Sequence, residues 1–95
     1  MSQQTLGNPT DKTPISVTDI AQEVVITHGV QSIEFVNLGT SDVYYGAYAT
    51  VTSARGGVIF SGGGNKTFEN IPSNWRISFI CATGKTSTLR QINYV

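Results

Sequence analysis

The sequence predicts an all-β protein: an antiparallel β-sandwich, of the jelly-roll or immunoglobulin-like type, with about seven or eight strands and an extended N-terminal arm. Two observations predict this class. Short segments rich in β-branched and aromatic residues alternate with turn-forming residues about every 8–12 positions. No segment keeps the apolar period of about 3.6 residues that marks a helix. A chain of 95 residues is long enough for one domain with a single modest core.

Residues 1–14 stand apart from the predicted strands. Leu6 is their only large apolar side chain after the first residue, and a glycine and two prolines interrupt regular structure. We therefore expect residues 1–14 to form an arm that is flexible or extended in isolation, or that becomes ordered on a neighbouring subunit. The arm lacks the apolar core and early basic residues of a signal peptide, so we expect the chain to fold in a cytoplasm.

The remaining residues, 15–95, are predicted to form the single β-sandwich domain. In chain order the predicted strands cover residues 15–18, 23–27, 32–38, 43–52, 58–60, 66–71, 75–82 and 86–95. Clusters of Gly, Ser, Asn, Asp and Pro separate them and predict turns. Residues 18–25 are the best helix candidate because Thr18 or Asp19 could cap a helix. Val24, Val25 and Ile26 nevertheless favour a strand there.

Alternation within the strands assigns side chains to faces. Ile33 and Phe35 share one face of their strand, and the strand from Trp75 to Cys81 has a similar apolar face. In the segment 43–52, Val43 and Tyr45 lie on one face, while Tyr44, Gly46 and Tyr48 lie on the other. These patterns predict two half-buried sheets that share one core.

Composition and charge argue against several kinds of partner. Charged residues make up 13% of the chain, against about 25% in an average protein, and six basic residues balance six acidic ones. The basic residues are scattered, so no basic stripe predicts nucleic-acid binding and no polybasic cluster predicts binding to an anionic membrane. No apolar run approaches the ~20 residues that span a bilayer.

The stretch FICATGKT, residues 79–86, ends like a phosphate-binding loop. That motif requires a glycine five positions before Gly84, where this chain has Phe79, and it must open a helix. The segment that follows is rich in β-branched residues and predicts a strand instead. We therefore expect residues 83–85 to form a hairpin turn with Lys85 exposed at its tip. The similar stretch SGGGNKT, residues 61–67, is predicted to be a flexible corner between strands.

No set of residues predicts catalysis, a cofactor or a metal site. His28 is the only histidine, and the six carboxylates are spread along the chain. Cys81, the only cysteine, lies on an apolar strand face, where a thiol is usually an inert core residue. A nucleophile pair of Cys81 and His28 would need an accessible thiol of lowered pKa, which burial opposes. The sequence therefore predicts a protein that is not an enzyme.

Exposed tyrosines are the best candidates for contact with a ligand. Tyr44 and Tyr48 flank Gly46 on the face opposite the predicted core, and exposed tyrosines mark sites that bind proteins or sugars. The alternative is that the two rings cover the outer face of the sandwich or pack under the N-terminal arm. Together with Lys85, they form the set of predicted partner or glycan contacts.

The order of strands and turns resembles small β-sandwich virion proteins of tailed bacteriophages. The resemblance covers roughly residues 20–95 and includes four local features. They are Val36-Asn37-Leu38-Gly39, Val43-Tyr44-Tyr45-Gly46, the glycine-rich corner 62–66 and the Thr83-Gly84 turn. The resemblance implies a capsid decoration (cement) protein or another accessory subunit of the head or tail. It also implies a homo-oligomer, most often a trimer, that binds the major capsid protein or another virion protein.

Two functional hypotheses follow. The first is a non-enzymatic structural protein of a phage virion, made in the host cytoplasm and bound to the particle by surface contacts. The second is a carbohydrate-binding or adhesion module on a tail or fibre, which would use Tyr44 and Tyr48. Few charges, many small polar residues and free strand edges suit either role.

Overall fold

The computed structural model describes residues 9–46, 51–52 and 56–95 of the chain, and within these ranges it contains nine β-strands and no helix. The strands are β1 (Pro9–Asp11), β2 (Ile15–Val17), β3 (Gln22–Ile26), β4 (Val30–Asn37), β5 (Val43–Gly46), β6 (Gly57–Ile59), β7 (Asn65–Ile71), β8 (Trp75–Ile80) and β9 (Ser87–Tyr94). Accordingly, the described part of the chain holds no helix long and apolar enough to cross a membrane.

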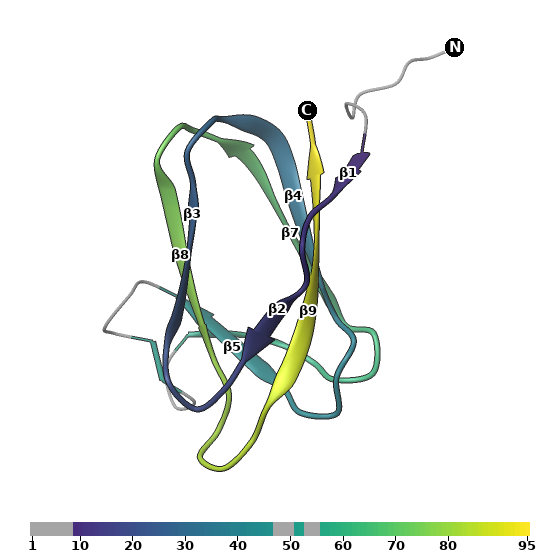
Figure 1. Ribbon diagram of the computed structural model, residues 1–95, viewed down its shortest axis with the longest axis vertical. Coiled ribbons are helices and arrows are strands. Elements are labelled where there is room, and N and C mark those ends of the chain that lie inside the picture. Colours follow the sequence, from purple (N-terminus) through teal and green to yellow (C-terminus); the bar gives the residue numbers. More distant parts are fainter. Residues whose placement is uncertain (1–8, 47–50, 53–55) are drawn as a thin grey trace.

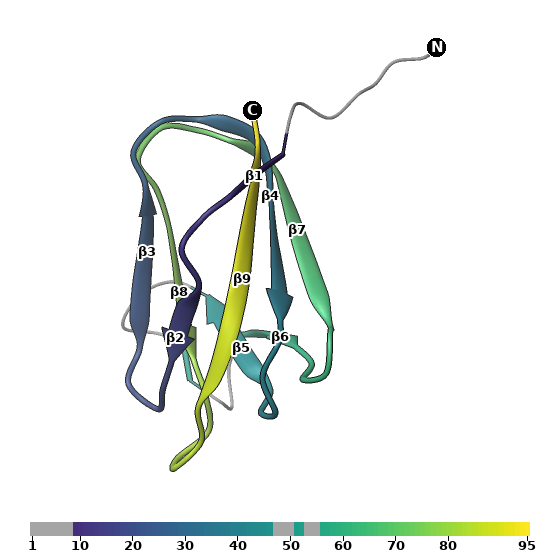
Figure 2. The same ribbon diagram turned by 45° about the vertical axis from the view of Figure 1, so that its right-hand side comes forward.

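The strands form two antiparallel sheets that face each other (Figure 1). One sheet has the order β1-β9-β4-β7, with β2 also paired to β9, and the other has the order β3-β8-β5-β6. Seen from a second direction, β3 and β8 lie on one side and β9, β4 and β7 on the other (Figure 2). The prediction of an all-β protein with antiparallel sheets is confirmed.

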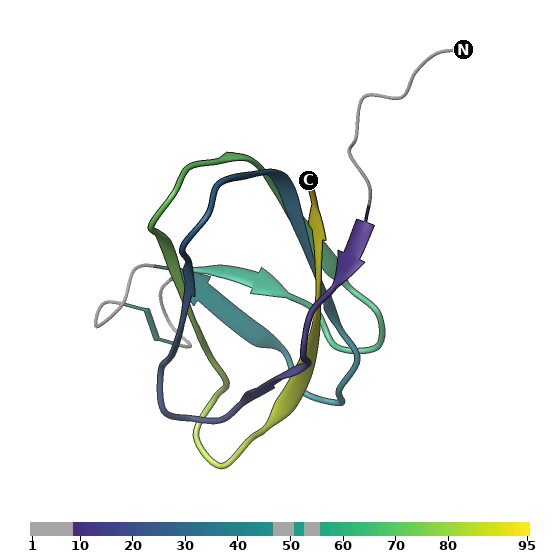
Figure 3. The ribbon, with the colours of Figure 1, turned by 45° about the horizontal axis from the view of Figure 1, so that its top comes forward.

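The pairing is nested along the chain. Strand β2 pairs with β9, β3 with β8, β4 with β7 and β5 with β6, and every pair is antiparallel. Successive pairs belong alternately to the two sheets. The first half of the chain therefore runs beside the second half in reverse order, and the ribbon curls around one core (Figure 3).

Strand positions agree closely with the pattern of the sequence. Each of the eight predicted strands overlaps an observed one, and residues 22–26 form a strand and not a helix. The additional strand, β1, lies inside the segment that was expected to be an arm. It pairs with the C-terminal half of β9, and the guanidinium of Arg90 donates two hydrogen bonds, of 3.1 and 3.2 Å, to the Asp11 carboxylate. Residues 1–8 lie outside the described residues.

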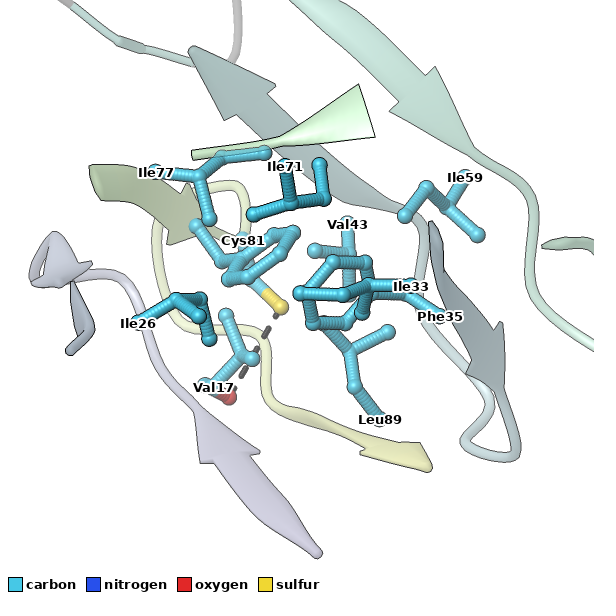
Figure 4. Packing of buried hydrophobic residues seen from close by; sticks show 11 residues of the cluster. Val17, Ile26, Ile33, Phe35, Val43, Ile59, Ile71, Ile77, Cys81 and Leu89 are labelled. Atoms are coloured by element: carbon cyan, nitrogen blue, oxygen red, sulfur yellow. Dashed lines mark hydrogen bonds between the residues drawn. The ribbon is translucent and has the colours of Figure 1, made fainter. Parts of the chain in front are cut away.

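The core is apolar and draws side chains from both sheets (Figure 4). Its buried members are Val17, Ile26, Ile33, Phe35, Val43, Ile59, Ile71, Ile77, Phe79, Cys81 and Leu89. Phe35 of one sheet meets Phe79 of the other with ring centroids 4.8 Å apart and an interplanar angle of 62°. Edge-to-face contacts of this kind are favourable for aromatic pairs. The predicted core faces of β4, β5 and β8 are confirmed.

Aromatic rings extend the core toward one flank. Phe68 on β7 contacts Phe35, Tyr45 and Trp75, with ring centroids 5.3 to 6.0 Å apart. Tyr45 lies flat against Gly57 of the neighbouring strand, where a Cβ atom would collide with the phenol ring. Trp75 is half-buried against this cluster, as expected for a residue that opens a core strand.

Candidate binding site at the loop end

Four loops meet at one end of the two sheets. Because the strands are antiparallel and nested, β2, β4, β6 and β8 all lead to this end (Figure 1, bottom). The connecting residues are 18–21, 38–42, 60–64 and 81–86, and we call this surface the loop end. Loops at the end of a rigid β scaffold are a common place for binding residues.

Asn37, at the end of β4, holds the 38–42 loop together with the strand ends beside two other loops. Its side-chain amide nitrogen donates to the carbonyls of Ser41 (2.8 Å) and Ile59 (2.9 Å), and its Oδ1 accepts from the Gly39 amide (3.0 Å). Oδ1 also accepts a 2.6 Å hydrogen bond from the Ser87 hydroxyl. Asn37 is fully buried, so these bonds replace water for every polar atom of the side chain.

Further hydrogen bonds join neighbouring loops. Oδ1 of Asp42 accepts from the Ser61 amide at 2.9 Å, which ties the β4–β5 loop to the β6–β7 loop. Oδ2 of Asp19 accepts from the Gly84 amide at 2.9 Å, which ties the β2–β3 loop to the β8–β9 hairpin. The loop end is therefore preorganised, and a partner that binds it has little loop entropy to overcome.

Two of the three predicted contact residues meet in one hollow at the loop end. Tyr44, half-buried on the outer face of β5, and Lys85, exposed on the β8–β9 hairpin, line a space of about 310 Å³ together with Asp42 and Ser61. Thr40, Ser41 and Ala82 complete the lining. The third predicted residue, Tyr48, lies outside the described residues. The hollow thus offers an aromatic ring, a carboxylate, an ammonium group and several hydroxyls.

The loop end also carries exposed apolar side chains. Ile20 is 75% exposed, Leu38 58% and Phe60 62%, and each belongs to a different loop of the loop end. Two other large apolar residues of the described chain, Val25 and Val95, are similarly exposed but lie elsewhere in the fold. Exposed apolar side chains on tethered loops are available for contact with another molecule.

The two stretches that resembled phosphate loops have structural roles. Gly84 has a φ of 76° and makes the β8–β9 turn, as predicted. In the corner 61–64, Gly62 and Gly63 have φ values of 76° and 105°, which favour glycine. Their amides donate to Gly39 and Asn37 carbonyls, and the Gly64 amide donates to Phe60. Because these N–H groups are already bonded, the corner is a tethered turn and not a cradle for an anion.

Cys81 is a core residue. Its side chain is buried, and its thiol donates to the Val17 carbonyl at 3.7 Å (Figure 4). Burial, and to a lesser extent the charges of Asp19 and Asp42, raise the pKa of this thiol. His28 is exposed in the turn between β3 and β4. Within the described ranges, no three or more His, Cys, Asp or Glu side chains gather as metal ligands would.

Sequence reasoning missed the residues that shape the loop end. Leu38 and Phe60 were assigned to strand ends, but β4 ends at Asn37 and β6 at Ile59, so both residues lie in loops. Asn37 was recognised only as part of a strand-end pattern, and its contacts to residues 41, 59 and 87 depend on loops that close in three dimensions.

Comparisons of the chain with protein-family models, with curated proteins and with solved structures each find no match.

Proposed function

We propose that the protein is a non-enzymatic structural protein of a phage virion, most simply a capsid decoration protein that binds the major capsid protein. The observation that carries the proposal is the loop end itself. Three exposed apolar side chains stand on loops that are held together by hydrogen bonds. Such a surface is suited to rigid docking on a protein partner, because apolar area is buried while few loops need to be ordered.

We further propose that strands β2–β9 form a jelly roll. The nested pairs β2:β9, β3:β8, β4:β7 and β5:β6, divided between two sheets of four strands, support this assignment. Jelly rolls occur in viral capsid proteins and in lectins, so this analogy of fold is compatible with both functional hypotheses. In the same proposal, β1 is the anchored base of the N-terminal arm.

A non-enzymatic role agrees with the state of the only thiol. Cys81 is enclosed by core side chains, and its raised pKa keeps it in the neutral, weakly nucleophilic form at neutral pH. His28, the only histidine, lies in a surface turn between strands of different sheets and does not contact the thiol.

The proposal predicts that the protein is part of the mature particle. Quantitative mass spectrometry of purified virions should find it at a copy number that is a simple fraction of the number of shell subunits. Absence from purified particles would reject the proposal.

A pair of variants tests the docking surface. Phe60→Asp places a charge in the exposed apolar set, whereas Thr67→Asp places the same charge on an exposed position of β7, outside the four loops of the loop end. We expect Phe60→Asp to weaken binding to virus particles that lack this protein at least tenfold and Thr67→Asp to leave that binding unchanged. Equal binding by both variants would remove the loop end from the proposal.

A second candidate function is carbohydrate binding. It is favoured by the hollow that brings Tyr44, Asp42 and Lys85 together, since sugars are bound by aromatic rings and by paired donors and acceptors. Tyr44→Ala should abolish binding to glycans on an array. Asp42→Asn keeps an acceptor for the Ser61 amide while removing the charge, so it separates loop structure from recognition. An array with no bound glycan for the unmodified protein would reject this function.

A further inference from the structure

A second hollow opens on the flank of the molecule, between the two sheets. It has a volume of about 380 Å³ and is lined by residues 24–27 on one side and by Gln91 and Asn93 on the other. Lys12 and His28 also line it. None of these residues belongs to the loop end, so the hollow is a separate feature of the fold.

The hollow meets β3 at its backbone edge. In a strand, successive side chains point to opposite faces, so a space above one face would touch only alternate residues. Here three consecutive β3 residues, Val24, Val25 and Ile26, line the hollow, as does Thr27 just after the strand. β3 is also the last strand of its sheet and pairs only with β8. The hollow therefore borders the row of N–H and C=O groups that β3 leaves unpaired within the described structure.

The edge of β7, in the other sheet, is protected against such pairing. Lys66 pairs with Phe35 and so lies on the core side of β7, where its ammonium group is 5.6 Å from the centre of the Phe68 ring. Asn70 has a φ of 58°, which bends the strand near its end. Inward charges and bends are known devices that prevent edge-to-edge association. β3 carries Val24, Val25 and Ile26 and has neither device.

Two buried amides face the hollow from β9. Gln91 and Asn93 are paired with Phe35 and Ile33, which places them on the core side of their sheet. They are only 5% and 7% exposed, and Gln91 Nε2 donates to Asn93 Oδ1 at 2.9 Å. Among the described residues no other side-chain hydrogen bond to this pair is present, which leaves Gln91 Oε1 and Asn93 Nδ2 for a ligand. The pair therefore offers at least one acceptor for a peptide N–H and one donor for a peptide C=O.

The chemistry of the hollow therefore fits an extended polypeptide. A free strand edge supplies backbone hydrogen bonds, the amide pair supplies two more, and valine and isoleucine side chains supply apolar contact. A sugar would be expected to stack on aromatic rings, and no Phe, Tyr or Trp is among the described residues that line the space.

We propose that this hollow accepts residues 1–8 of a second copy of the chain, which add to β3 as an extra strand. β1 begins at Pro9, opposite Tyr94, beside the Asn93 and Val95 that line the hollow. Eight extended residues reach about 26 Å, more than the ~17 Å of a five-residue strand such as β3. Residues 1–8 contain no charged side chain, and Leu6 suits the apolar wall formed by Val24 and Ile26.

A neighbouring copy is the better donor because of where β1 starts. From Pro9 the chain runs along β9, away from the end at which residues 1–8 join it. The same copy would have to reverse direction near Pro9 to reach its own β3, a constraint that does not apply to the β3 of a neighbouring copy. Donor and acceptor are different surfaces, so the contact is heterologous and closes into a ring, such as a trimer, when the rotation allows.

Two full-length variants test the proposal. Leu6→Asp disrupts the inserted segment, residues 1–8, and leaves the hollow intact. The double variant Gln91→Leu, Asn93→Leu disrupts the hollow and leaves the inserted segment intact. In sedimentation velocity runs we expect the unmodified chain to self-associate, and each variant alone to associate at least tenfold more weakly. An equimolar mixture of the two variants should regain a one-to-one complex, because the Leu6→Asp variant supplies an intact hollow and the double variant supplies an intact segment 1–8.

A peptide supplies a second readout if a variant does not fold. Added MSQQTLGN, the sequence of residues 1–8, should dissociate oligomers of the unmodified chain, and a peptide of scrambled sequence should not. The proposal is overturned if the unmodified chain is monomeric at all concentrations, which is also the result expected if each copy fills its own hollow. It is overturned equally if the mixture regains no complex. These results do not depend on whether the protein binds a virion.

Discussion

The buried side-chain amides at the loop end and on the flank differ in how many of their hydrogen bonds are made within the chain. Asn37 at the loop end uses both its donors and accepts two bonds, all within the chain. Gln91 and Asn93 on the flank share one bond and line a hollow. All three side chains are at least nine-tenths buried.

The difference separates a structural amide from a binding amide. A buried amide with every bond satisfied holds loops in place, and its removal leaves several backbone groups without partners. A buried amide with spare capacity adds little to folding, and it gains a full set of bonds only when a ligand arrives. On this basis the loop end is rigid before binding, while the flank is completed by a partner.

The largest expected effect is that of Asn37→Ala. The change removes four hydrogen bonds and leaves polar groups of residues 39, 41, 59 and 87 without a partner. We therefore expect a loss of about 4 kcal/mol in the free energy of unfolding. That is a large share of the ~5–15 kcal/mol typical of a domain. Urea denaturation measures it. Asn93→Ala is the matched control and should cost about 1 kcal/mol or less; equal losses would erase the distinction between the two groups.

Gly57→Ala tests the packing of Tyr45 against β6. The added methyl group would collide with the Tyr45 ring, so we expect a loss of about 1–3 kcal/mol without any change in amide bonding. Gly62→Ala is a useful comparison, because the space around Gly62 is open and only its positive φ opposes the change. Thermal unfolding of both variants ranks the two costs, and a larger loss at Gly62 would contradict the packing described for Tyr45.

Replacement of both flank amides by leucine sharpens the comparison. The double variant Gln91→Leu, Asn93→Leu removes one internal hydrogen bond but adds apolar contact in the hollow. We expect its free energy of unfolding, measured on the monomer at low concentration, to stay within about 1 kcal/mol of the unmodified chain or to rise. A loss as large as that of Asn37→Ala would mean that these amides are structural.

Cys81 adds a pH-dependent case. Its pKa is raised in the folded state, first by burial, so the fold favours the neutral thiol. Stability from this group is complete below its ordinary pKa of 9.0 and is lost as the pH rises above that value toward the folded pKa, because the unfolded chain ionises first. Urea denaturation from about pH 7 to pH 10.5 should show a steeper alkaline loss for the unmodified chain than for Cys81→Ala. Parallel pH curves would rule out a shifted thiol.

The smallest expected effect is that of Ser32→Ala. The Ser32 hydroxyl is buried and has no hydrogen-bond partner within the described structure. Its removal should leave stability unchanged or raise it by up to about 1 kcal/mol, because an unsatisfied polar group is removed. Differential scanning calorimetry measures the change, and a clear destabilisation would reveal a partner for this hydroxyl.

Most of the fold could be predicted from the sequence, because local patterns report it directly. Alternation in β4 and β8 assigned Ile33, Phe35, Ile77 and Phe79 to the core, and the Gly84 turn followed from its neighbours. Which strands pair could not be predicted, since the nested order depends on contacts between segments far apart in the chain.

The candidate site was predictable only in part. Tyr44 and Lys85 were chosen as exposed residues, but their common hollow arises because the β5 strand and the β8–β9 hairpin meet at one end. Gln91 and Asn93 alternate with Ile92 and Tyr94 in β9, and alternation alone does not say which of the two faces is inward. The register with Ile33 and Phe35 decides that question, and it is set by tertiary pairing.

The most direct test of the contrast between the two groups of amides is an NMR dilution series of the full-length chain. The side-chain NH₂ signals of Gln91 and Asn93 should shift and saturate as the concentration rises and the second copy enters the hollow, while the signal of Asn37 stays fixed. Fixed signals for Gln91 and Asn93 across an association observed by sedimentation, or a shift of Asn37 instead, would contradict the account.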